Sequence, residues 1–183
     1  MAQSEKETEA IIRGNEAYKN KQYDNAIDAY KKALEIAPKS PIANYNLAIA
    51  LYRDKKWDQA ENYFEAAIAN TNDKKMEADA WYNKGVSLTM QKKLLESIEA
   101  YKNSLRINPA DTLARENLQR ALNELKKQQQ QDQKKNQEKK QQNKLTKQQV
   151  QQLLQALQEQ EKMLQRKMNK TKVPSPGQPD KDW

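Results

Sequence analysis

The chain has 183 residues, of which 36% are hydrophobic, and a formal net charge of +8. It contains no Cys and no His, which excludes thiol nucleophiles, disulfides and most transition-metal sites. Basic and acidic residues are equal in number through residue 111, so the positive charge belongs to residues 112–183.

The first residues leave the cellular location open. The start Met1-Ala2-Gln3-Ser4-Glu5 fits a mature N-terminus left by cleavage at a small-residue site, with a start Met added, and thus a periplasmic protein. It equally fits an ordinary cytoplasmic start. No stretch approaches the roughly 20 apolar residues of a membrane-spanning helix, so we expect no membrane span.

Three similar segments follow one another. Each contains a small residue and, four positions later, an aromatic ring: Ala26 and Tyr30, Ala60 and Phe64, Ser97 and Tyr101. The small residues are separated by 34 and then 37 positions. This pattern resembles the tetratricopeptide (TPR) repeat, a pair of short helices. The resemblance implies an all-α helix-turn-helix solenoid that serves as a binding surface.

We expect a TPR array over residues 7–127, after an N-terminal extension of residues 1–6. The repeats are predicted at 7–40, 41–77 and 78–111. Repeat 2 carries three additional residues around Asn72-Asp73-Lys74-Lys75, which indicate a longer loop between repeats. Gly14, Ala48 and Gly85 are predicted to lie where the first helix of each repeat crosses its neighbour, so that a large side chain there would clash.

Residues 112–127 are predicted to form the capping helix that ends a solenoid, with Asp111 as its N-cap. The Gln/Lys-rich linker 128–145 has no apolar residue through Asn143, so it is either disordered or a solvated extension of the capping helix. Residues 146–169 predict an amphipathic helix that begins with a capping box at Thr146-Lys147-Gln148-Gln149. Residues 170–183 are predicted to form an extended C-terminal tail.

The tail carries a second, more specific resemblance. The segment Leu145–Glu161 and the ending Lys181-Asp182-Trp183, together with the repeats, resemble the TPR protein of the Bacteroides aerotolerance (Bat) operon. That resemblance implies a periplasmic scaffold linked to oxidative stress tolerance. Its implied partners are membrane-anchored von Willebrand factor A-domain proteins and a MoxR-type ATPase system.

We expect no enzyme and no cofactor. With three glycines there is no Gly-rich phosphate loop, and no His is present to activate Ser or Thr. Carboxylate pairs such as Asp24/Asp28 and Glu61/Glu65 have the spacing of an exposed helix face. The remaining functions are a scaffold in an envelope complex, or alternatively a cytoplasmic TPR adaptor or chaperone-like factor.

The predicted partner-binding groove is lined by the first helices of the repeats. In the TPR family this surface holds asparagines that bond a bound peptide backbone, and the matching residues here, with their apolar and polar neighbours, are Asn15, Tyr45, Asn46, Ile49, Tyr52, Arg53, Tyr82, Asn83, Val86 and Asn117. The carboxylate clamp of chaperone-binding TPR proteins also needs basic residues. The clamp positions hold Ile11, Asp79 and Asn83 instead, which argues against capture of a C-terminal carboxylate.

A second docking element is predicted in the tail, from an apolar stripe and the terminal tryptophan: Leu153, Leu154, Leu157, Leu164 and Trp183. The stripe either serves a partner or folds back on the capping helix. Lys134-Lys135, Lys139-Lys140 and Arg166-Lys167 raise the further alternative of polyanion binding, which salt would abolish. We expect no nucleic-acid partner, and a monomer outside the complex.

Overall fold

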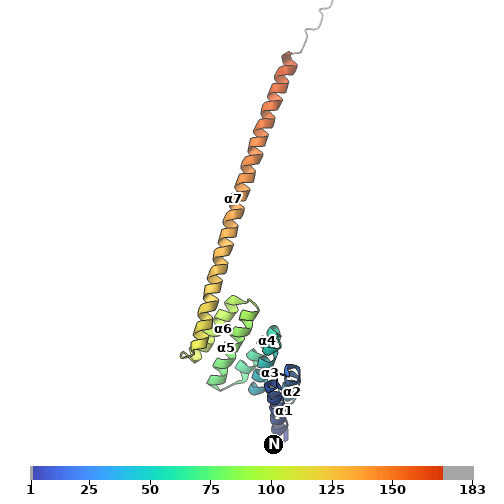
Figure 1. Ribbon diagram of the computed structural model, residues 1–183, viewed down its shortest axis with the longest axis vertical. Coiled ribbons are helices and arrows are strands. Elements are labelled where there is room, and N and C mark those ends of the chain that lie inside the picture. Colours follow the sequence, from blue (N-terminus) through green and yellow to red (C-terminus); the bar gives the residue numbers. More distant parts are fainter. Residues whose placement is uncertain (1, 171–183) are drawn as a thin grey trace, which may run out of the picture. The chain divides into compact units, whose positions relative to one another are not determined.

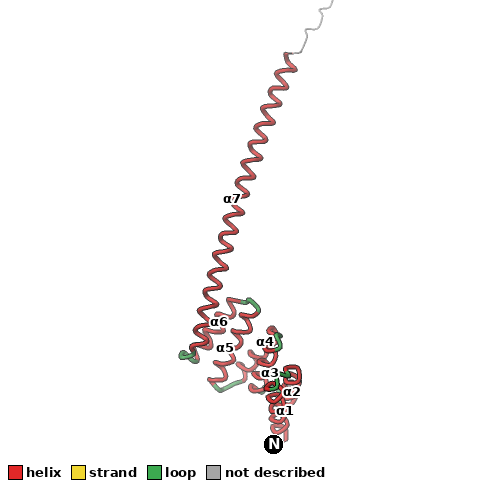
Figure 2. Tube along the Cα trace, in the orientation of Figure 1, coloured by secondary structure: helices red, strands yellow, loops and turns green. Residues whose placement is uncertain are grey.

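The computed structural model describes residues 2–170, and within them it contains seven helices and no strand. The helices are α1 (Ala2–Lys19), α2 (Tyr23–Ile36), α3 (Pro41–Arg53), α4 (Trp57–Asn70), α5 (Lys74–Met90), α6 (Leu94–Ile107) and α7 (Thr112–Lys170). Figure 1 shows α1–α6 stacked in pairs, and Figure 2 shows the short loops that join them. The expected all-α solenoid is confirmed.

The chain divides into two units, Met1–Gln129 and Gln130–Trp183. In the first unit each helix packs against the next one from α1 to α6, and α3 also contacts α1 and α5. The first helices of consecutive repeats therefore lie side by side. This neighbour-only packing is typical of solenoids.

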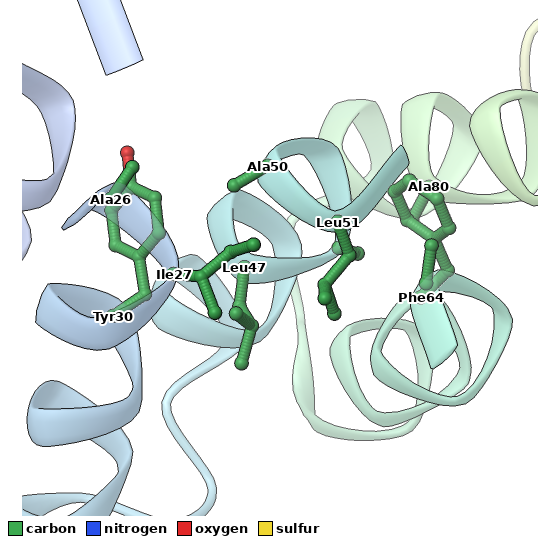
Figure 3. Packing of buried hydrophobic residues seen from close by; sticks show 10 residues of the cluster. Ala26, Ile27, Tyr30, Leu47, Ala50, Leu51, Phe64 and Ala80 are labelled. Carbon is green, nitrogen blue, oxygen red and sulfur yellow. The ribbon is translucent and has the colours of Figure 1, made fainter. Parts of the chain in front are cut away.

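The core of the first unit crosses the repeat boundaries. Ile27 and Tyr30 of α2, Leu47 and Leu51 of α3 and Phe64 of α4 belong to one buried cluster. Figure 3 shows this row of side chains running from Tyr30 through Leu47 and Leu51 to Phe64. A second cluster joins Ile98 and Tyr101 of α6 to Ala121 of α7, so the beginning of α7 covers the last repeat as a capping helix.

The turns inside the three repeats share one conformation. Lys21, Lys55 and Lys92 have φ values of 59°, 61° and 62°, a left-handed conformation that non-glycine residues adopt at a cost. The amide of the following residue bonds five positions back in each case, for example Lys56 N to Leu51 O at 2.9 Å. Each turn is thus a Schellman motif, which ends the first helix of its repeat. Sequence inspection missed it because Lys replaces the usual Gly.

Two boundaries differ from the sequence-based expectation. The additional residues of repeat 2 do not lengthen the loop, because Asp73 caps α5 through its Oδ1 and the helix already starts at Lys74. The segment 128–145 is helical, so of the two alternatives it is the extension of the capping helix. Thr146 begins no helix: it lies inside α7, and its hydroxyl donates to Gln142 O at 2.9 Å.

Two buried hydroxyls, Ser87 Oγ and Ser104 Oγ, have no hydrogen-bond partner among the described residues. The equivalent positions in repeat 2 hold Ala50 and Ala67, both fully buried. A buried polar group without a partner costs free energy. We therefore expect Ser104→Ala to stabilise the fold by about 1 kcal/mol, measured by urea denaturation.

Ser97 provides the matched control for this prediction. It is also buried, but its hydroxyl donates to Leu94 O at 2.8 Å. Ser97→Ala removes a satisfied hydroxyl and should bring no comparable gain. Equal stabilisation by the two substitutions would show that helix propensity, not the unpaired hydroxyl, decides the effect.

Candidate functional site

The first helices of the repeats present their predicted site residues on one face. In α3 these include Tyr45, Asn46 and Ile49, and in α5 they are Tyr82, Asn83 and Val86; Ile42 and Met90 lie on the same faces of these two helices. Spacings of three, four and seven residues place side chains on the same side of a helix. We call this surface of α1, α3, α5 and the beginning of α7 the A-helix face.

Asparagines and tyrosines connect neighbouring helices of the A-helix face by hydrogen bonds. Asn46 Nδ2 of α3 donates to Asn15 Oδ1 of α1 at 3.1 Å. Asn83 Nδ2 of α5 donates to the Tyr45 hydroxyl of α3 at 2.9 Å, and Asn117 Nδ2 of α7 donates to the Tyr82 hydroxyl of α5 at 3.0 Å. The two Asn-to-Tyr bonds are the same contact in successive repeats, and the equivalent Asn46 instead bonds an asparagine of α1. We call these six residues the Asn–Tyr ladder.

In each asparagine of the ladder, one of the two polar side-chain atoms is bonded and the other has no partner among the described residues. Asn15 Oδ1 also accepts from the Tyr30 hydroxyl at 2.7 Å, and Asn83 Nδ2 also donates to Asp79 O at 2.9 Å. Among the described residues, no hydrogen bond reaches Oδ1 of Asn46, Asn83 or Asn117. Each of these carbonyls is therefore oriented by the bond on its own amide nitrogen and keeps its acceptor capacity unused within the described residues.

Burial keeps the tyrosines of this region neutral. It raises the pKa of Tyr45 to about 12, with Asp79 as the next contribution, and it raises the pKa of Tyr30 to about 12 as well. The Tyr45 ring lies edge-on to Phe64, with ring centroids 5.9 Å apart. With these raised pKa values both hydroxyls stay protonated at neutral pH and act as hydrogen-bonding groups.

The other predicted groove residues have mixed roles. Ile49 and Tyr52 are partly buried against the first core cluster, and Val86 is partly buried against the second. Arg53 is exposed, and its Nε donates to the Tyr18 hydroxyl at 3.1 Å. Tyr18 was missed by sequence inspection, although it is the repeat equivalent of Tyr52. Whether these residues bind a partner stays a prediction.

The predicted second docking element lies on α7. Its four leucines are exposed, with values of 64% for Leu153, 55% for Leu154, 50% for Leu157 and 63% for Leu164. Trp183 lies outside the described residues. A docking role for this stripe stays a prediction.

Asp79 lies one turn before Asn83 in α5. Burial raises the pKa of its carboxyl group, Asp111 and Asp73 raise it further, and Lys75 lowers it. A raised folded-state pKa means that the native chain binds more protons than the unfolded chain between the two pKa values. The stability contribution of Asp79 is therefore lost as the pH rises through its folded-state pKa.

Asp79→Asn removes this ionisation. We expect a higher melting temperature than that of the wild type at neutral pH, and a gain that disappears below the ordinary aspartate pKa of about 4. Thermal unfolding across this pH range measures it. Asp28→Asn, on the exposed side of α2, is the matched control and should not show this gain. A pH-independent gain for Asp79→Asn would contradict the explanation.

Metal binding and membrane spanning find no support in the part of the chain that the structure describes. No group of three or more Asp and Glu side chains there is arranged to hold a metal ion. No described helix combines the length and the apolar character that crossing a membrane requires.

Comparisons with known proteins agree with this architecture. A family model described as "TPR repeat" matches residues 14–55, and one described as "Tetratricopeptide repeat" matches residues 45–112. Similar curated proteins are the Hsp70-Hsp90 organising protein of Plasmodium falciparum, 34% identical over 98 residues, and the RNA polymerase II-associated protein 3 of Homo sapiens, 31% identical over 115 residues. These matches cover 51% and 63% of this chain, but only 17% and 16% of those proteins.

Among solved structures, the first TPR of Spaghetti (RPAP3) bound to the HSP90 peptide SRMEEVD is 30% identical, with a TM-score of 0.63. The match covers 67% of this chain and 94% of that one. The first TPR domain of human RPAP3 is 27% identical, with a TM-score of 0.62 and coverages of 68% and 95%. The repeat period, the stacked helix pairs and these matches together establish that the chain belongs to the tetratricopeptide repeat family.

Proposed function

We propose that this protein is a non-catalytic adaptor that binds a segment of a partner protein on its A-helix face. The observation that carries the proposal is the Asn–Tyr ladder, which orients amide carbonyls at one position of successive helices. A peptide backbone offers N–H donors along its length, and each donor needs an acceptor once it leaves water. Half-exposed apolar side chains on the same helix faces as the ladder residues, Ile42 and Met90, would contact the side chains of such a segment.

The similar proteins support an adaptor role. The first TPR of Spaghetti (RPAP3) holds an HSP90 peptide, and a curated relative is named as an organising protein of Hsp70 and Hsp90. We therefore favour a TPR adaptor or chaperone-associated factor over a scaffold defined by an envelope complex. The partner itself is to be identified by experiment.

The experiment selects binders from a library of short random peptides with amidated C-termini. Selected peptides are then measured against the wild type and the double variant Ile42→Ser/Met90→Ser. Both side chains are about half exposed, at 48% and 47%, so this change should leave the melting temperature nearly unaltered. We expect the double variant to lose about tenfold or more in affinity, because two apolar contacts disappear.

Leu95→Ser is the matched control. Leu95 is an apolar residue of α6 with 63% exposure and lies outside the A-helix face. It should leave peptide affinity unchanged. If the double variant keeps its peptide affinity, the binding site does not lie on the A-helix face. The same conclusion follows if Leu95→Ser loses as much affinity as the double variant. Ladder asparagines are unsuitable for this test, because their substitution also removes bonds between helices.

A second candidate is the envelope scaffold of the Bat type, in the periplasm. The observation that favours it is the resemblance of the segment Leu145–Glu161, within α7, and of the ending Lys181–Trp183, which lies outside the described residues. It predicts copurification of von Willebrand A-domain membrane proteins with the full chain from native envelope fractions. Deleting residues 144–183 should abolish that copurification. Recovery of the protein without such partners from a soluble fraction would contradict this candidate.

A further inference from the structure

One position of the A-helix face is apolar in two helices and acidic in the helix between them. The repeat equivalents are Ile42 in α3, Asp79 in α5 and Leu113 in α7. Ile42 is 48% exposed and Leu113 is 59% exposed. A single carboxylate thus stands between two exposed apolar side chains in a row that runs across three neighbouring helices.

The Asp79 carboxylate belongs to the immediate surroundings of the ladder. Its own backbone carbonyl accepts from Asn83 Nδ2 at 2.9 Å, and its charge acts on the Tyr45 hydroxyl. This backbone bond and this electrostatic effect place Asp79 near ladder residues on two helices. A ligand bonded to the free carbonyl of Asn83 would therefore pass within reach of Asp79.

Lys75 is the cation that acts on Asp79, and its effect on the pKa does not outweigh burial. Among the described residues, the Asp79 carboxylate makes no hydrogen bond and no ion pair, and the neighbouring Lys74 pairs with Glu77 instead. The two acids that act on it, Asp73 and Asp111, already accept backbone amides at the starts of α5 and α7. Burial penalises the charged form of Asp79, and a paired cation would offset that penalty.

We propose that the segment bound on the A-helix face is an internal, extended peptide that places an Arg or Lys side chain against Asp79, with apolar residues beside it on Ile42 and Leu113. The inference rests on the peptide-binding function proposed above and names its ligand class. Charge complementarity selects this occupant. A basic side chain pairs with the Asp79 carboxylate, which has no ion-pair partner among the described residues, whereas an acidic segment meets the like charges of Asp79, Asp73 and Asp111.

The test sequences the peptides that bind in the amidated random library. Selection is run with the full chain as wild type, Asp79→Asn and Asp79→Lys. We expect Arg and Lys to be enriched at one position of wild-type binders, the enrichment to vanish with Asp79→Asn, and acidic residues to replace it with Asp79→Lys. For one Arg-containing binder we expect about a tenfold loss of affinity on Asp79→Asn. Asp28→Asn is the control for charge alone and should leave the enrichment intact.

The outcomes separate the two proposals. Binders that depend on Ile42 and Met90 but show no preference for Arg or Lys overturn the ligand class and leave the adaptor function standing. Binders whose basic residue is retained with Asp79→Asn also overturn it, because another group then makes the contact. A library that yields no binder sensitive to Ile42→Ser/Met90→Ser overturns both.

Discussion

Leu47→Ala is expected to destabilise the array by about 2–5 kcal/mol. Leu47 is fully buried in α3 and belongs to the cluster that joins α2, α3 and α4. Removing its side chain loses the transfer free energy of the deleted groups and leaves a cavity between two repeats. Because a solenoid is stabilised by contacts between neighbours, a defect at this boundary also weakens the coupling of repeats 1 and 2.

Urea denaturation followed by tryptophan fluorescence measures this effect, since Trp57 and Trp81 lie in α4 and α5. Far-ultraviolet circular dichroism alone would include the helix of residues 130–170. Leu95→Ala is the control of the same chemistry at 63% exposure, and it should change stability by no more than about 0.5 kcal/mol. Similar losses for the two variants would mean that Leu47 is not the core contact described above.

Much of the fold follows from the sequence, because its main determinants are local. The repeat period predicts the helix pairs, and Asp111 caps α7 as expected, since its Oδ1 accepts from Ala114 N at 3.0 Å. The capping helix was predicted to end near Lys127, but α7 continues to Lys170. The composition of the following segment explains why. Gln, Lys and Glu are good helix formers and no Gly or Pro interrupts them, so α7 continues past Thr146.

The candidate site was only partly predictable. Asn46, Asn83 and Asn117 are recognisable from their equivalent positions in the repeats. Their partners Asn15, Tyr45 and Tyr82 were predicted as groove residues, but the bonds between them depend on how one helix pair is placed on the next. That placement is a tertiary property that the periodicity of a single chain does not contain. Only the structure shows that the Nδ2 atoms of Asn46, Asn83 and Asn117 are bonded and that, among the described residues, their Oδ1 atoms are not.

The glycines of repeats 1 and 3 were predicted to be sites of close approach, and the structure confirms it. A Cβ atom added at Gly14 would lie 2.6 Å from Tyr30 Cδ1, and one added at Gly85 would lie 2.7 Å from Tyr101 Cε1. In repeat 2 the equivalent pair is Ala48 and Phe64. The two rings also differ in their hydrogen bonding, because Tyr101 OH lies 3.0 Å from Thr89 Oγ1. Phe64 has no such bond.

Gly85→Ala is accordingly expected to destabilise the array by about 1–3 kcal/mol through overpacking. Gly85 does not adopt a positive φ, so Ala fits its backbone and would by itself favour the helix by about 1 kcal/mol. The clash outweighs this gain because Tyr101 is 1% exposed and has no space to move into. A double-mutant cycle with Tyr101→Leu isolates the clash. In the background of that second substitution Gly85→Ala should be neutral or stabilising, whereas an equal loss in both backgrounds would show that the ring is not the obstacle.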